Sequence, residues 1–207
     1  TGGAMTRKRT IHNLRQNARA RQSDWWARIF DELLFMYASG ARGVNSEYIF
    51  PTAYTGMATN AFVAPDAAHI IYGDGTSKAT VTAAGKMSLA LIDKCVVKST
   101  MRGGGTTGIP AIEPIMIDGE QHYCLLMNPF QEYDLRTSTS TGQWLDIQKA
   151  AAGAEGNKST IFKGGLGMYN KVVLHTHKAV IRFSDYGAGS NVAAARALFM
   201  GRQAVVM

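Results

Sequence analysis

The chain has 207 residues, of which 46% are hydrophobic and 18% charged; this is enough for a folded core and excludes a disordered chain. Most of its net charge of +7 is local, because residues 1–28 hold seven Lys and Arg against one Asp. Such a cationic segment suits a polyanion or an acidic patch on another subunit. No apolar run approaches the ~20 residues of a membrane-spanning helix, so we expect no membrane partner. Cys95 and Cys124 lack metal or redox spacing, and we expect buried free thiols in a reducing compartment.

A long amphipathic helix is predicted over residues 6–39, which contain no Gly or Pro. Thr6 or Thr10 is expected to cap its start, and Gly40 to end it. Apolar residues recur there at helical spacing, at Ile11, Leu14, Ala18, Trp25, Ile29, Leu33 and Met36. A second apolar stripe occupies only the C-terminal half, at Trp26, Phe30, Leu34 and Tyr37. That half is apolar over a wide arc, and we expect it to be buried.

The length of this helix indicates that it needs a partner. At 1.5 Å per residue the rod is roughly 50 Å long, whereas a compact domain of this size is roughly 30–40 Å across. Part of the rod must therefore project beyond its own core, where other copies or further protein segments would cover it.

Residues 41–79 are rich in Gly, Ala, Thr, Asn and Pro, and we expect a long irregular excursion, which in compact proteins is usually functional or disordered. A second helix is predicted over residues 82–101 and is stopped by the glycines at 103–105. The dipeptide Asp118-Gly119 then predicts a hairpin between strands at 114–117 and 121–127.

Asn128-Pro129 opens a short helix, with Asn128 as N-cap and Gln131 in the position of a capping box. Its buried side is expected to hold Phe130, Tyr133 and Leu135. Further along, we expect a helix at 143–152 and a strand at 172–183, whereas 192–207 is ambiguous between helix and strand. This order of elements predicts an α+β fold.

No constellation of residues points to catalysis, so we expect neither an enzyme nor a bound cofactor. His175 and His177 lie two apart on the predicted strand and could share a metal ion. No third ligand is near in the sequence, and a polar strand face is favoured. The glycines at 103–105 and 164–167 lack the placement and the Gly-Lys-Ser/Thr ending of a phosphate loop. The sequence contains no Gly-x-Ser-x-Gly elbow.

The candidate contact residues are basic side chains and tryptophans. Either a solvated helix face or a contact with a polyanion explains the basic residues, which are Arg7, Lys8, Arg9, Arg15 and Arg19. Either assembly anchors or plain core residues are expected at the tryptophans, which are Trp25, Trp26 and Trp144.

Several short stretches cover most of the chain in one order: MTRKRTIHNLR at 5–15, DWWA at 24–27, LIDK at 91–94, NPFQ at 128–131, DLRT at 134–137, WLDIQKA at 144–150, IFKGGLGMYN at 161–170 and RALFMG at 196–201. Together they resemble the N-four-type tailed-phage major capsid protein family. The stretch from 41 to 78 matches that family least.

The resemblance implies the Hong Kong 97-type capsid fold, in which a long spine helix runs along a peripheral domain and an axial domain fills the centre of each hexamer or pentamer. On this basis we expect a spine helix at 1–40, a variable excursion at 41–79, a peripheral subdomain of helix and hairpin at 80–128, and an axial subdomain at 129–207. The family's N-terminal arm and extended loop are expected before Thr1 and its last strands after Met207, so we expect a fragment that lacks both ends.

The function that this resemblance implies is a structural capsid subunit that self-assembles into an icosahedral shell around double-stranded DNA. The expected partners are other copies in hexamers and pentamers, the packaged DNA on the inner face, and scaffold, portal or decoration proteins. The expected location is the virion, with the host cytoplasm during assembly. The residues alone leave an alternative, a sequence-nonspecific nucleic-acid-binding module that uses the Arg-rich helix.

Overall fold

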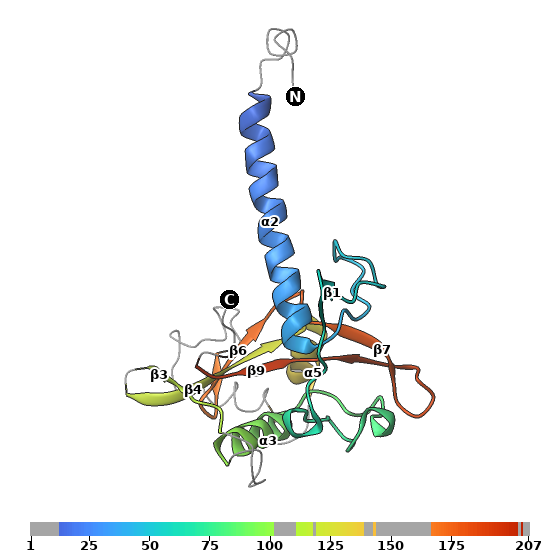
Figure 1. Cartoon of the computed structure of the whole chain (residues 1–207). Coiled ribbons are helices and arrows are strands. Elements are labelled where there is room, and N and C mark those ends of the chain that lie inside the picture. The colour runs from blue at the N-terminus through green and yellow to red at the C-terminus, as the bar shows by residue number, and fades with distance from the viewer. Residues whose placement is uncertain are drawn as a thin grey trace.

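The computed structural model of the protein describes residues 13–101, 111–117, 119–138, 143, 167–202 and 204. Sheets and short helices form a body, and one long helix stands out from it as a rod (Figure 1). The mixture of helices and mainly antiparallel strands confirms the α+β class.

The rod is α2 (Leu14–Ser39), which ends where the sequence predicted but begins later. Gly40 caps its end at a φ of 68°, a left-handed conformation that glycine adopts without strain. Asn13 is the N-cap, because its side chain accepts a hydrogen bond from a backbone N–H of the first turn. The caps predicted at Thr6 or Thr10 are therefore wrong for this helix. Its 26 residues span roughly 39 Å.

The central sheet is organised around β4, which pairs with strands from distant parts of the sequence. Its five strands are β3 (Ile115–Ile117), β4 (Glu120–Met127), β5 (Met168–Tyr169), β6 (Val172–Thr176) and β9 (Leu198–Met200). The order is β3-β4-β6-β5, and β9 also pairs with β4. β4 and β6 run parallel, and the other pairs are antiparallel. The β3–β4 pair confirms the predicted hairpin.

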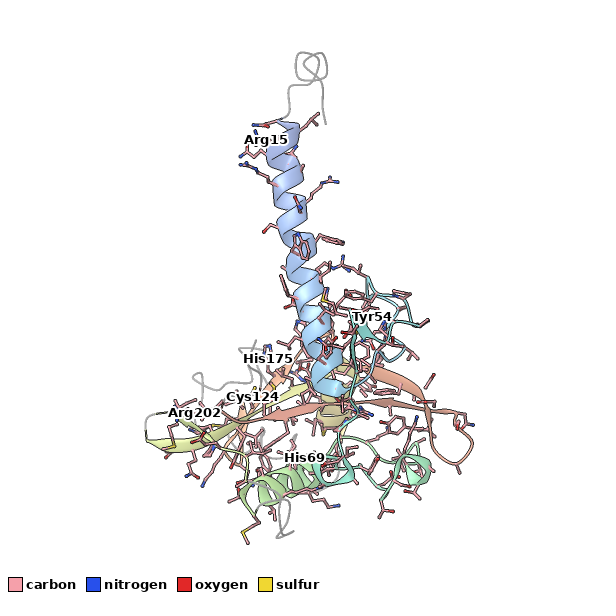
Figure 2. All side chains as sticks on the ribbon, viewed as in Figure 1. Arg15, Tyr54, His69, Cys124, His175 and Arg202 are labelled. Carbon is pink, nitrogen blue, oxygen red and sulfur yellow. The ribbon has the colours of Figure 1, made fainter. Side chains whose placement is uncertain are left out.

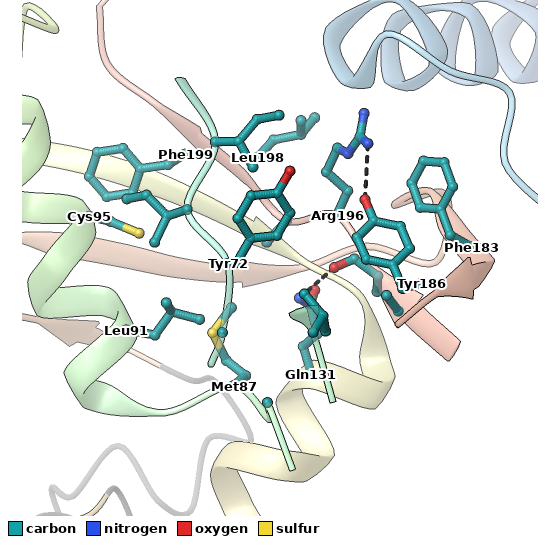
Figure 3. A pocket seen from close by; sticks show the side chains of 18 of the residues that line it. Tyr72, Met87, Leu91, Cys95, Gln131, Phe183, Tyr186, Arg196, Leu198 and Phe199 are labelled. Carbon is teal, nitrogen blue, oxygen red and sulfur yellow. Dashed lines mark hydrogen bonds between the residues drawn. The ribbon is translucent and has the colours of Figure 1, made fainter. Parts of the chain in front are cut away.

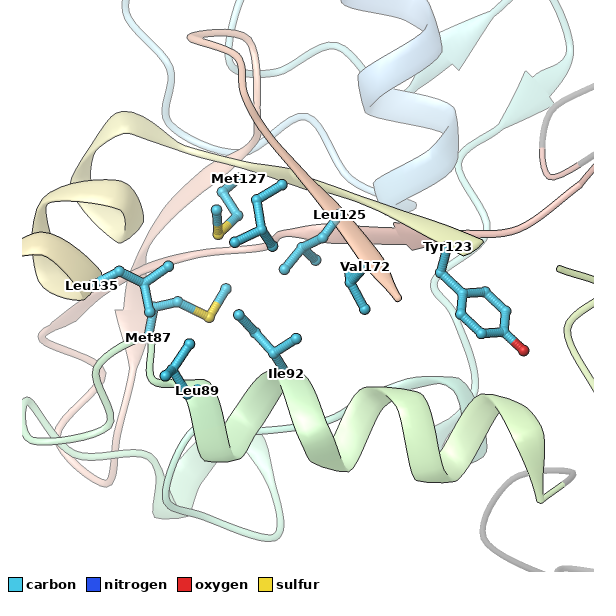
Figure 4. Close-up of a cluster of buried hydrophobic side chains, with 9 residues drawn as sticks. Met87, Leu89, Ile92, Tyr123, Leu125, Met127, Leu135 and Val172 are labelled. Carbon is cyan, nitrogen blue, oxygen red and sulfur yellow. The ribbon is translucent and has the colours of Figure 1, made fainter. Parts of the chain in front are cut away.

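Alternation of side chains along β4 separates two buried clusters on opposite faces of the sheet. Tyr123, Leu125 and Met127 belong to the cluster that packs against α3 (Leu89–Thr100), as Figure 4 shows. Leu126 points the other way and packs against the cluster to which α2 contributes. The root of the rod and α3 therefore cover different faces of one sheet.

The second predicted helix exists as α3, but it begins at Leu89 and not near Thr82. Ser88 is its N-cap, because the serine hydroxyl accepts a hydrogen bond from the Leu91 N–H. The residues before Ser88 form a turn, in which the Gly85 N–H bonds to the Thr82 carbonyl. The glycines at 103–105 lie outside the described residues.

The short helix α5 (Pro129–Thr137) follows β4 with the predicted capping box at Asn128. Leu135 is fully buried as expected, but Phe130 and Tyr133 are 64% and 65% exposed. The prediction of one buried side for all three residues is therefore wrong. α5 packs on the body at Leu135, while both aromatic rings face outward.

The strand predicted over 172–183 is in fact two strands of different sheets. After β6 the chain turns at residues 177–180, where the Val180 N–H bonds to the His177 carbonyl. It then enters β7 (Arg182–Tyr186), which pairs with β8 (Val192–Ala195) in a separate two-stranded sheet. The ambiguous segment 192–207 contains two strands, β8 and β9. The helix predicted around Trp144 lies outside the described residues.

We use "the excursion" for residues 41–79, which are largely irregular as predicted. Their regular elements are short: β1 (Gly56–Met57), β2 (Asn60–Ala61) and single 3-10 turns at Ala67–His69 and Lys78–Thr80. In Figure 1 the part around β1 lies beside the root of α2.

Two buried polar side chains fix the start of the excursion: Arg42 bonds within the excursion, and Asn45 ties it to the body. Arg42 donates to the Phe50 carbonyl from both Nε and Nη2, at 3.0 and 2.7 Å. Asn45 donates to the Val180 carbonyl at 3.2 Å and accepts from the Arg182 N–H at 2.7 Å. Buried polar groups are costly unless they are paired in this way, so these bonds fix where the excursion starts.

The described parts of residues 80–128 and 129–207 share a sheet, because β4 pairs with both β6 and β9. They also share the buried cluster under α3. The assignment of these two ranges to peripheral and axial subdomains stays a prediction.

Candidate assembly surface

The two halves of α2 lie in different surroundings (Figure 2). We call residues 14–28 the projecting half and residues 29–39 the packed half. Every residue of the projecting half is exposed. The packed half contains all the buried residues of the helix, which are Ile29, Glu32, Leu33, Phe35, Met36 and Ser39.

The packed half is held by apolar packing and by one buried carboxylate. Met36 is fully buried, and the Phe35 ring stacks on His177 with ring centroids 4.9 Å apart. Glu32 is only 5% exposed and accepts a hydrogen bond from the Ile49 N–H at 2.8 Å. Glu32 was not predicted from the sequence, although its spacing of four residues from Met36 places it on the buried face.

The aromatic side chains of α2 continue beyond its packed half as an uncovered group. Trp25 lies four residues before buried Ile29, and so extends the buried face outward. Its ring meets the Trp26 ring edge-on at a centroid distance of 5.2 Å, and the Trp26 and Phe30 centroids are 6.0 Å apart. Trp25, Trp26 and Phe30 are 46%, 43% and 54% exposed. Neither tryptophan belongs to the described core, which favours the interpretation of both as anchors.

The prediction that the packed half is buried over a wide arc is wrong for its second stripe. Phe30 and Tyr37 are 54% and 37% exposed. The excursion reaches this face at Tyr37, whose hydroxyl accepts from the Met57 N–H and donates to the Asn60 carbonyl, both at 2.8 Å. On this face of the helix the excursion's contact at Tyr37 lies two turns beyond Phe30, and Phe30 stays half exposed to solvent.

Three arginines of the projecting half are available for a partner. Within the part of the chain that the structure describes, Arg15, Arg19 and Arg21 form no ion pair, and all three are exposed. Arg28 differs, since it lies 3.8 Å from the Glu32 carboxylate. The other predicted contact residues lie outside the described residues: Arg7, Lys8, Arg9 and Trp144.

The thiols and histidines of the described residues form no reactive centre. Cys95 and Cys124 are free and partly buried, and burial raises the pKa of Cys95 to about 11 and that of Cys124 above its ordinary value. Both are therefore neutral thiols near pH 7. The His177 Nδ1 accepts a hydrogen bond from the Ala179 N–H, so this nitrogen is not free to bind a metal. No cluster of three His, Cys, Asp or Glu that could hold a metal occurs among the described residues.

A cavity of about 780 Å³ lies between α3 and the strands β8 and β9 (Figure 3). Its polar side chains are engaged within the protein: Arg196 donates to the Tyr186 hydroxyl at 3.0 Å, and Gln131 donates to the Ala195 carbonyl at 3.1 Å. The neutral thiol of Cys95 lies in its wall. An active site needs a nucleophile and a base that converge, and the described lining of this cavity shows no such pair.

These features are those of a protein with an uncovered surface for association. A helix whose apolar face runs past its own core leaves that face without cover, and large uncovered apolar patches mark interaction sites. In the described part of the chain, no helix has the length and apolar character to cross a membrane.

The sequence matches the family model described as phage capsid protein over residues 1–207, and the chain belongs to this family. The proteins of this family are structural proteins of phage capsids. The resemblance to phage major capsid proteins that the sequence motifs indicated is confirmed.

Two solved structures are similar to the chain. The capsid of Ralstonia phage GP4 is 53% identical with a TM-score of 0.81, and the match covers 98% of this chain and 56% of that one. The capsid of cyanophage Pam1 is 17% identical with a TM-score of 0.60, covers 88% and 52%, and shows a likeness of fold alone. The chain thus spans about half the length of these capsid chains. No curated protein matches the sequence.

Proposed function

We propose that this capsid subunit self-assembles, as hexamers and pentamers, into an icosahedral shell that encloses double-stranded DNA. The observation that supports this function most directly is the exposed aromatic group of α2 in a chain of the phage capsid family. Closed shells arise from repeated contacts between identical subunits, and an uncovered helix face supplies one such contact. Scaffold, portal and decoration proteins are the further partners proposed, with assembly in the host cytoplasm.

The finer fold that we propose is the Hong Kong 97-type capsid fold, with α2 as the spine helix. Residues 80–128 would then belong to the peripheral subdomain and residues 129–207 to the axial subdomain. The proposal is supported by the length of α2 and by the TM-score of 0.81 to the Ralstonia phage GP4 capsid.

Sedimentation velocity and negative-stain electron microscopy test self-assembly. We expect the protein to form large, concentration-dependent oligomers or shells. A variant with Trp25→Asp and Trp26→Asp should lose them while its circular dichroism is unchanged, because both side chains are exposed. The matched control is Ala188→Asp with Ser190→Asp, which adds the same charge to the exposed β7–β8 turn and should assemble normally. A protein that remains monomeric under assembly conditions contradicts the function.

A second candidate function is nonspecific DNA binding, favoured by the exposed and unpaired arginines of the projecting half. Arg and Lys can neutralise phosphates without reading the base sequence, and the affinity then falls steeply with salt. Its test is a neutral variant in which five residues become Gln: Arg7, Lys8, Arg9, Arg15 and Arg19. DNA affinity should collapse while oligomers persist, and an unchanged affinity and salt slope exclude this function.

A further inference from the structure

The surface of α2 that the excursion covers at Tyr37 continues uncovered along the projecting half. Phe30 and Trp26 lie seven and eleven residues before Tyr37, spacings that place all three on one helix face. At Tyr37 the excursion supplies the Phe62 ring, at a centroid distance of 4.9 Å, as well as two hydrogen bonds to the hydroxyl. One excursion therefore covers only the root of a face whose next aromatic residues remain 54% and 43% exposed.

The charge of the projecting half is opposite to that of the excursion. Residues 13–28 carry four arginines and one aspartate, a net charge of +3. Residues 43–77 contain no Lys or Arg and carry Glu47, Asp66 and Asp74, a net charge of −3. Arg15 and Arg19 lie on the same face as Trp26, at spacings of eleven and seven residues, so the uncovered face is both aromatic and cationic.

The excursion presents apolar side chains to solvent beside its acids. Val63 is 82% exposed and Met57 is 49% exposed. The Asp66 side chain, three residues beyond Val63, is 66% exposed. An apolar and acidic surface of this kind complements an aromatic and basic helix face in both chemistry and charge.

We propose that residues 43–77 of a second copy of this chain dock on the projecting half of α2. Within one copy, the excursion covers this helix face at Tyr37. The proposed contact would cover the rest of the same face with the excursion of another copy. It is heterologous, because a different surface of each copy takes part, and such contacts close into rings when the rotation between copies permits. The proposal rests on the proposed self-assembly and names the surfaces that meet.

Cysteine cross-linking between two single variants tests the contact directly. Ser23→Cys places a thiol on the exposed projecting half, seven residues from Phe30, and Val63→Cys places one on the excursion. Because each variant carries one added thiol, a disulfide between positions 23 and 63 in mixed particles can form only between copies. We expect a covalent dimer from this mixture. When Ala188→Cys replaces Val63→Cys, the amount of covalent dimer should not exceed that of the unmodified protein.

The outcomes separate this contact from self-assembly itself. Particles that give no link between positions 23 and 63, or an equal link with position 188, overturn the docking and leave shell assembly standing. A failure of the unmodified protein to form particles overturns both.

Charge reversal gives a second, independent test in the absence of DNA. Arg15→Glu with Arg19→Glu should raise the concentration needed for assembly about tenfold or more, because like charges would then face each other across the contact. The matched control, Lys171→Glu with Lys178→Glu, makes the same change in net charge at two other exposed positions. Light scattering measures both, and an equal shift in the two variants overturns the proposal.

Discussion

The packed and projecting halves of α2 continue one helix with one apolar periodicity, yet they end in opposite surroundings. In the packed half Ile29 and Met36 are 5% and 0% exposed, whereas in the projecting half Leu14 and Trp25 are 42% and 46% exposed. The helical pattern thus specifies a face to be covered and leaves open which molecule covers it. In a capsid subunit, the uncovered stretch is where contacts between copies are expected.

The contacts made by the two halves of α2 differ in kind as well as in extent. The packed half meets the body of its own chain through the stack of Phe35 on His177, and it meets the excursion through the hydrogen bond from Ile49 to Glu32. The projecting half carries aromatic rings and unpaired arginines, which suits a surface that is exposed to water in the free subunit and is covered on association. Substitutions in the two halves should therefore separate folding from assembly.

Met36→Ala should produce the largest loss of stability. Removing this fully buried side chain leaves a cavity against the sheet and should lower the free energy of unfolding by about 2–5 kcal/mol. Met36→Leu, which nearly conserves volume, should cost less than about 1.5 kcal/mol. Urea denaturation measures both. An alanine variant as stable as the parent contradicts the assignment of this half of the helix to the core.

Tyr37→Phe should produce a smaller loss, because it removes only the hydroxyl that joins α2 to the excursion. That hydroxyl bonds to both Met57 and Asn60, and its loss should cost about 0.5–1.5 kcal/mol. Tyr133→Phe is the matched control, since Tyr133 is 65% exposed and its hydroxyl has no hydrogen-bond partner in the described residues. Equal effects in the two variants contradict a specific bridge at Tyr37.

The root of α2 should respond to mild acid through His177. Burial lowers the pKa of His177, an effect that Asp31 opposes while His175 and Lys178 add to it. The unfolded chain therefore binds a proton at a higher pH than the folded chain does. This contribution to stability is complete above the ordinary value of 6.5 and declines as the pH falls toward the lowered folded pKa.

Replacement of the imidazole tests that dependence. His177→Phe keeps a flat ring against Phe35 but cannot be protonated, so its unfolding free energy should decline less between pH 7 and pH 5 than that of the parent. Chemical denaturation at several pH values measures the difference. Parallel curves for parent and variant mean that another group causes the decline.

Elements bounded by local signals could be predicted from the sequence. Gly40 ends α2 because glycine takes the left-handed cap, and Asn128 opens α5 because its side chain accepts a hydrogen bond from the first turn. The β3–β4 hairpin follows from a dipeptide suited to a tight turn. In each case the deciding interaction lies within a few residues.

Boundaries and burial that depend on distant residues could not be predicted. The strand at 172–183 divides because its first part pairs with β4, about fifty residues away in the sequence, whereas its second part pairs with β8 in another sheet. Phe130 and Trp26 occupy apolar helix positions, but periodicity cannot say whether a partner surface faces them. The anchor residues of the candidate surface could therefore be identified from the sequence. Their exposure could not, because it depends on how the body is arranged around α2.

The smallest change in stability, with the largest change in assembly, is expected from Trp25→Ala with Trp26→Ala. Both rings are about half exposed and lie on the projecting half, so the free energy of unfolding should change by less than about 1 kcal/mol. Tryptophans at the centre of an interface can each contribute about 2 kcal/mol or more to association, and sedimentation should show oligomers lost at concentrations where the parent assembles. Gln22→Ala, an exposed change on the same half of the helix, is the control and should alter neither property. A loss of stability as large as that of Met36→Ala would mean that the tryptophans support the subunit's own fold, and the distinction between the two halves of α2 would fail.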